Sequence, residues 1–124
     1  MSYEWDNKKA TAQMLGRFQP FHEGHYALFE EIIKKTGQVC IEVRDVQGVA
    51  DNPFNFETIK KEIEEKLNPK YKNRFKVILV PNITNISYGR GVGYKIEEVV
   101  LPEKIQQISA TKIRAKMRKE GKIK

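Results

Sequence analysis

The feature that most constrains the fold is an alternation of short β-rich runs with longer amphipathic segments. Apolar and β-branched runs bounded by turn residues predict strands, whereas apolar residues three and four positions apart predict helices. The expected strands cover residues 11–15, 38–43 and 75–80, and the expected helices cover residues 24–36 and 56–67. A strand, a helix and a second strand in this order form a unit with parallel strands. We therefore predict an α/β fold, a single Rossmann-like parallel sheet with helices on both faces.

The last third of the chain has weaker patterns. We read residues 84–93 as a loop with a short strand at 86–88, and residues 96–101 as a further strand that Pro102 ends. A final helix is expected over residues 111–119, with Ser109 as its N-cap and Gly121 beyond its end. With no internal repeat and no linker, the chain is expected to form one domain over residues 1–124, with a basic helix and tail at about 109–124.

The net charge of +7 is concentrated at the end of the chain. Residues 112–124 carry seven basic side chains against one acid, Glu120. Such a field attracts polyanions, which include nucleotides, phosphorylated metabolites and nucleic acids. No apolar stretch approaches the length of a membrane-spanning helix, and the single cysteine, Cys40, suits a reducing compartment. We expect a cytoplasmic protein with no membrane partner.

The most informative stretch for function runs from Gly16 to His25, between the first strand and the first helix. Ligands bind beyond the carboxyl ends of parallel strands, where a helix N-terminus offers free amides and a positive dipole to a phosphate. This stretch contains Arg17 and the only two histidines, His22 and His25, with Gly24 between them where the backbone must turn closely into the helix. Imidazole and guanidinium donors suit phosphoryl transfer, in which the protein mainly positions reactants and stabilises charge.

A second cluster, Ser109, Thr111 and Arg114, lies at the start of the last expected helix. Thr111 and Arg114 are three residues apart and so lie on one helix face. Hydroxyls and free amides at that end would suit the β- and γ-phosphates of a nucleotide, and Arg114 would add a fork of donors. Serine and threonine also commonly cap helices, so simple capping is the alternative interpretation of this cluster.

Two strings resemble those of a known superfamily. Gly16-Arg17-Phe18-Gln19-Pro20-Phe21-His22-Glu23-Gly24-His25 resembles the first signature of the HxGH nucleotidyltransferases, a superfamily of adenylyltransferases and cytidylyltransferases, and most closely that of nicotinamide-nucleotide adenylyltransferases. Ile108-Ser109-Ala110-Thr111-Lys112-Ile113-Arg114 resembles the second signature, ISxTxxR. The resemblance implies a nucleotidyltransferase/HUP-like fold. It also implies an enzyme that transfers a nucleoside monophosphate, with AMP from ATP favoured, to a phosphate-bearing acceptor such as a mononucleotide and releases pyrophosphate by direct in-line displacement.

Carried over position by position, the resemblance assigns roles to both clusters. The implied catalytic residues are His22, His25 and Arg114. The implied nucleotide-binding residues are Gly16, Arg17, Phe18, Gly24, Ser109 and Thr111. Magnesium is implied as a cofactor that bridges the nucleotide phosphates, and no side chain is expected to ligate a metal directly.

The acceptor side is less defined. Asn52-Pro53-Phe54 resembles the NPF segment of nicotinamide-nucleotide adenylyltransferases, and Phe21, Phe54 and Arg90 are candidate acceptor-binding residues. A mobile loop is the alternative interpretation of the glycine-rich surroundings of Arg90. Cytidylyl transfer from CTP to a polyol or sugar phosphate ranks second, because the first motif of those enzymes typically carries an aspartate where Gln19 stands.

Two further alternatives belong to other functional classes. A nucleic-acid-binding module would use the basic tail, with Tyr71, Tyr88 and Tyr94 as stacking surfaces. It leaves the HxGH string unexplained, so nucleic acid is the less expected partner. A non-catalytic nucleotide sensor would keep both motifs. A homo-oligomer is retained as an alternative to a monomer.

Overall fold

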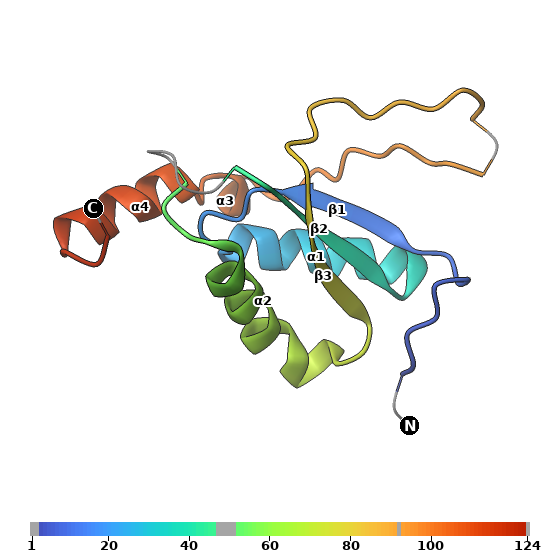
Figure 1. Ribbon diagram of the computed structural model, residues 1–124, viewed down its shortest axis with the longest axis horizontal. Coiled ribbons are helices and arrows are strands. Elements are labelled where there is room, and N and C mark those ends of the chain that lie inside the picture. Colours follow the sequence, from blue (N-terminus) through green and yellow to red (C-terminus); the bar gives the residue numbers. More distant parts are fainter. Residues whose placement is uncertain (1–2, 47–51, 92, 124) are drawn as a thin grey trace.

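The computed structural model describes residues 3–46, 52–91 and 93–123. In chain order the elements are β1 (Ala12–Gly16), α1 (Glu23–Thr36), β2 (Val39–Arg44), α2 (Phe56–Tyr71), β3 (Phe75–Val80), α3 (Glu103–Gln106) and α4 (Ala110–Lys119). The strands form one parallel sheet in the order β1-β2-β3 (Figure 1). The prediction of a parallel α/β sheet is confirmed. The turn expected at residues 47–53 lies mostly outside the described residues.

One face of the sheet carries the hydrophobic core. Along β2, Val39, Ile41 and Val43 are fully buried, whereas the residues between them are half-buried. The buried strand residues pack in one cluster with Phe29 of α1 and Ile63 of α2. Right-handed crossovers between successive neighbouring strands place both helices on the same side. The structure thus differs from the expectation of helices on both faces, because α1 and α2 share one face.

Contacts between α1 and α2 fix the end of α2. The Phe29 and Tyr71 rings lie 5.1 Å apart, and the Tyr71 hydroxyl donates a hydrogen bond of 2.5 Å to Glu30. The sequence predicts that Asn68-Pro69 closes this helix, but α2 continues through Pro69 to Tyr71. Proline removes one backbone donor. The buried Tyr71 holds the last turn in place despite that loss.

The segment from 81 to 101 leaves the end of β3 and returns to α3 as a long excursion away from the sheet (Figure 1). Strands were expected at 86–88 and 96–101, and both predictions are wrong for the described residues. Ile86 is 62% exposed and Val100 is 75% exposed, so their β-forming side chains have no neighbouring strand or core to pack against. A strand is stabilised by its pairing partners, and among the described residues no strand pairs with this segment.

The end of the chain folds as two helices. The short helix α3, which the sequence did not predict, precedes α4, and α4 matches the expected final helix within one residue at its start. Ser109 is its N-cap, as predicted, and its Oγ accepts a hydrogen bond of 3.4 Å from the Lys112 amide. Figure 1 shows both helices beyond the end of the sheet at which α1 begins.

Candidate functional site

The two histidines close the N-terminus of α1 reciprocally. His22 is the N-cap, and its Nδ1 accepts a hydrogen bond of 3.0 Å from the Gly24 amide. The Nδ1 atom of His25 accepts a hydrogen bond of 3.1 Å from the His22 amide. A neutral imidazole whose Nδ1 accepts must carry its proton on Nε2. Each histidine therefore presents an N–H donor away from the helix backbone.

Two glycines make this arrangement sterically feasible. A Cβ atom on Gly24 would lie 2.8 Å from Cε1 of His22, so any other residue would push that imidazole out of its cap. At the end of β1, a Cβ atom on Gly16 would lie 3.0 Å from the Phe18 ring. Phe18 has a left-handed backbone, with φ of 52°, which turns its ring back over Gly16.

Aromatic rings enclose His25. Its ring meets the edge of Phe18 at 4.9 Å and stacks on Phe21 at 5.6 Å, and both phenylalanines are buried. The His22 ring also stacks on that of His25, with 3.8 Å between centroids. Phe18 and Phe21 thus support the histidine pair from within the core.

This environment keeps both imidazoles uncharged. Burial, together with the nearby His22 and Lys66, lowers the pKa of His25 to about 3. Burial and Lys66 also lower the pKa of His22, while Glu23 acts in the opposite direction. Both side chains are therefore neutral hydrogen-bond donors at pH 7, without a charge of their own.

The two motifs meet in space, although 95 residues separate the contacting positions. Arg114 is 2% exposed, and its Nη1 donates a hydrogen bond of 2.6 Å to the carbonyl oxygen of Gln19. Its Nη2 donates to Thr111 Oγ1 at 3.4 Å. Arg114 therefore braces the first motif, and its role in phosphate binding stays a prediction. Thr111 itself is exposed, and the Ser109 hydroxyl caps α4.

Gln19 links the first motif to the NPF segment. Its side-chain amide donates to the Phe54 carbonyl and accepts from the Phe54 amide, each at 2.9 Å. Arg17, which is exposed, donates to the Asn52 side chain at 3.3 Å. Phe54 is half-buried against the core, so the structure brings this segment to the motif loop.

Arg90 is not brought to the motif residues. It is exposed on the 81–101 segment, and it shares no hydrogen bond or ion pair with them in the part of the chain that the structure describes.

Lys66 lies at the site although the sequence did not predict it. Its Nζ lies 3.4 Å from the Phe21 carbonyl oxygen, beside the histidine pair. One exposed lysine among several on an amphipathic helix carries no sequence signal of that contact.

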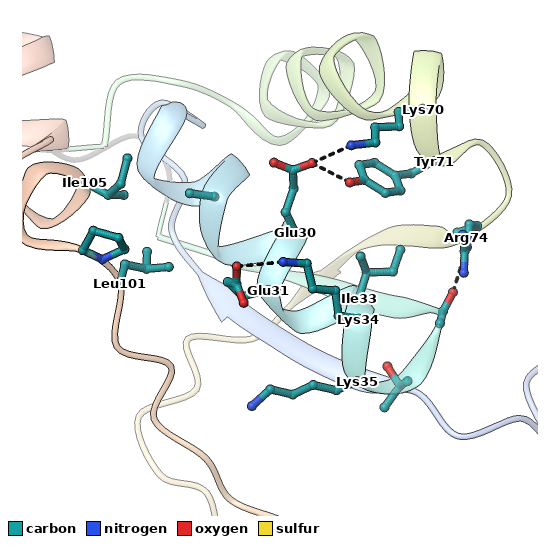
Figure 2. Close-up of a pocket in the computed structure, with 14 residues that line it drawn as sticks. Glu30, Glu31, Ile33, Lys34, Lys35, Lys70, Tyr71, Arg74, Leu101 and Ile105 are labelled. Atoms are coloured by element: carbon teal, nitrogen blue, oxygen red, sulfur yellow. Dashed lines mark hydrogen bonds and ion pairs between the residues drawn. The ribbon is translucent and has the colours of Figure 1, made fainter.

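An open groove lies elsewhere, along the outer side of α1 (Figure 2). Its lining includes Glu30, Lys70, Arg74, Leu101 and Ile105 but no residue of either motif. The charges in it are largely paired with each other, as Glu30 is with Lys70 at 3.1 Å. The groove therefore offers no chemistry comparable to that of the histidine pair.

Within the described ranges no three His, Cys, Asp or Glu side chains gather to hold a metal ion.

A family comparison bears on residues from β1 to α2. Residues 14–65 match the family model of cytidylyltransferase-like domains. The match covers the histidine motif, the NPF segment and most of α2, which is less than half of the chain. It indicates nucleotidyl transfer in general, and so a nucleoside triphosphate as substrate in general.

No curated protein matches the chain. Among the described residues, no helix is long and apolar enough to cross a membrane.

Proposed function

We propose that the protein is a nucleotidyltransferase that transfers AMP from ATP to a phosphate-bearing acceptor such as a mononucleotide. The observation that carries this proposal is the geometry of His22 and His25. The helix backbone fixes Nδ1 of each ring, which leaves two neutral Nε2–H donors next to the loop that Arg114 braces.

The chemistry follows from donors that are already oriented. An oxygen of the acceptor phosphate attacks the α-phosphorus in line, and the bond to the β-phosphate oxygen breaks, so pyrophosphate leaves with the bonding electron pair. The Nε2–H groups of His22 and His25 donate to the α-phosphoryl oxygens, on which charge develops. The N-terminus of α4 and Thr111 hold the leaving phosphates. This route needs no nucleophilic side chain.

The side chains at the site fit a metal that is bound through the nucleotide. They offer N–H and ammonium groups, whereas magnesium prefers oxygen ligands. Magnesium would therefore be held by the phosphate oxygens, where it offsets their charge, and this role is part of the proposal.

The Gln19 contacts support ATP over CTP. Gln19 both donates to and accepts from Phe54, which an aspartate or glutamate could not do when ionised. The glutamine and the NPF segment, the two features that resemble the adenylyl branch, therefore form one unit. CTP is the second candidate because the matching family model describes cytidylyltransferase-like domains.

A thermal-unfolding screen with ATP, CTP, GTP and UTP, each with magnesium, tests the proposal, since a ligand bound only by the native state raises the unfolding temperature. We expect the largest rise with ATP, followed by pyrophosphate release when a mononucleotide is added. The largest rise with CTP would move the assignment to cytidylyl transfer. Binding of ATP without pyrophosphate release from any acceptor tested would favour a sensor. No rise with any of the four, together with salt-sensitive RNA binding, would favour a nucleic-acid module.

The His25→Ala variant tests the assigned role. Removing one such donor should lower turnover about a hundredfold or more. Lys34→Ala, an exposed change on the same helix, is the matched control and should leave turnover unchanged. Undiminished turnover in His25→Ala would refute the assignment.

A further inference from the structure

The histidine pair brings no positive charge of its own to the site, and the nearby guanidinium groups of Arg17 and Arg114 donate to Asn52 and to the Gln19 carbonyl. A nucleoside triphosphate brings several negative charges, yet His22 and His25 are neutral at pH 7. Arg114 is buried and donates to the Gln19 carbonyl. Hydrogen bonds from neutral donors are weaker than charge-assisted ones, so tight phosphate binding calls for a cation at the pair.

Lys66 reaches this position from α2. Its Nζ donates a hydrogen bond of 3.4 Å to the carbonyl oxygen of Phe21, the residue directly before His22. The same atom lies 5.9 Å from the centre of the Phe21 ring, which stacks on His25. The ammonium of Lys66 thus lies against Phe21, the residue that joins the motif loop to the histidine pair. Lys66 itself belongs to neither sequence motif.

Lys66 acts electrostatically on Glu62 but forms no salt bridge among the described residues. Within the described part of the chain, no carboxylate oxygen lies within ion-pair distance of its Nζ. Glu62, one turn earlier on α2, is half-buried, and burial raises the pKa of its carboxyl while Lys66 acts against that rise. From α1, Glu23 faces His22, and from α2, Lys66 faces both histidines.

We propose that Lys66 supplies the positive charge that binds the nucleotide phosphates beside the histidine pair. This inference rests on the proposed function and adds a phosphate-binding residue to it. The contact of Lys66 with the Phe21 carbonyl is long, and the side chain is flexible and exposed, so exchanging that carbonyl for a phosphate oxygen needs only a rotamer change. A phosphate offers the ammonium a full negative charge, which the carbonyl does not.

Binding of ATP and of inorganic tripolyphosphate to four proteins tests the inference. The proteins are the wild type, Lys66→Met, Lys66→Arg and Lys61→Met, the last an exposed lysine on the same helix. We expect Lys66→Met to weaken both ligands about tenfold or more, as for one lost charge-assisted hydrogen bond. Lys66→Arg should recover most of the affinity, and Lys61→Met should bind as the wild type does.

A second readout needs no ligand. The chain has only two histidines, so nuclear magnetic resonance can follow each imidazole through a pH titration. Removing the neighbouring cation should raise the titration midpoint of His22 in Lys66→Met, but not in Lys61→Met. If Lys66 only stabilised the fold and its charge did not act on the imidazoles, the titration midpoint of His22 would not change.

The outcomes separate this inference from the proposed function. If the wild type binds neither ATP nor tripolyphosphate, both fail. If the wild type binds ATP and Lys66→Met binds it equally well, the function stands and the role of Lys66 is refuted. An equal loss in Lys61→Met would also refute it, because the effect would then be one of overall charge.

Discussion

Two irregular segments of this chain contrast sharply. In the motif loop between β1 and α1, the run from Phe18 to Phe21 is buried, although it contains no helix or strand. In the 81–101 segment, which is equally irregular, Tyr94 is 67% exposed and Val100 is 75% exposed. Irregular backbone becomes fixed where side chains satisfy its polar groups and pack under it. The motif loop meets both conditions.

This difference bears directly on function. A phosphoryl-transfer site needs donors held in place before the substrate arrives. Gln19 and Arg114 give the motif loop that rigidity, since one joins it to Phe54 and the other to α4. In the 81–101 segment, Glu97 forms an ion pair of 2.7 Å with Lys35 and Val99 packs against the core. Arg90 is exposed and takes part in neither contact, so it is not held in place to orient an acceptor.

The largest expected effect is at the brace of the motif loop. Arg114→Met removes a charged hydrogen bond to the Gln19 carbonyl from a buried position. We expect the free energy of unfolding to fall by about 2–4 kcal/mol. Urea denaturation measures this change, with Arg90→Met as the matched arginine control on the exposed segment. Equal stability of the two variants would break the contrast between the segments.

The next effect is at Gln19. Gln19→Glu keeps an acceptor for the Phe54 amide but places a carboxylate oxygen against the Phe54 carbonyl. We expect a loss of about 1–3 kcal/mol of stability at pH 7. Protonation of the new carboxyl restores a donor, so the deficit should shrink when urea denaturation is repeated at acidic pH. A deficit independent of pH would argue against the reciprocal pair.

The burial of His25 predicts a pH effect. Its pKa is about 3 in the folded protein and about 6.5 when unfolded, so below pH 6.5 the unfolded state binds the proton first. The free energy of unfolding should therefore decrease as the pH is lowered from 6.5 to 3, and this group should contribute up to about 1.4 kcal/mol per pH unit. Urea titrations of wild type and His25→Gln across that range give the difference in slope. Parallel curves would show that His25 is not buried as described.

The smallest effect is expected on the exposed segment. Ile86→Ser and Val100→Ser remove apolar side chains that are already largely in solvent. Each should change the free energy of unfolding by no more than about 0.5 kcal/mol. Urea denaturation measures this change. A loss above about 1 kcal/mol would mean that these two side chains are packed in the folded protein, and the contrast with the motif loop would fail.

Much of the fold could be predicted from local patterns. The three strands and the helices α1 and α2 follow from apolar periodicity and turn residues, and the placement of His22 and His25 at a helix start follows from the strand-loop-helix order. The strands expected after residue 84 failed because β-forming residues do not specify a strand without a partner.

Tertiary contacts explain what the sequence missed at the site. Arg114 was predicted as a phosphate ligand, and its burial against Gln19 depends on how α4 packs on the motif loop. The approach of Lys66 to Phe21 depends likewise on the packing of α2 beside α1. Neither contact leaves a periodic signal, because the partners are 95 and 45 residues apart.

The most direct test of the central claim follows the imidazole nitrogens of His22 and His25 by nuclear magnetic resonance while ATP or CTP is added. The account predicts that both Nε2–H signals shift with one common dissociation constant while both rings stay neutral. If saturating concentrations of either nucleotide leave both imidazoles unchanged, the histidine pair does not bind the triphosphate, and the account is contradicted.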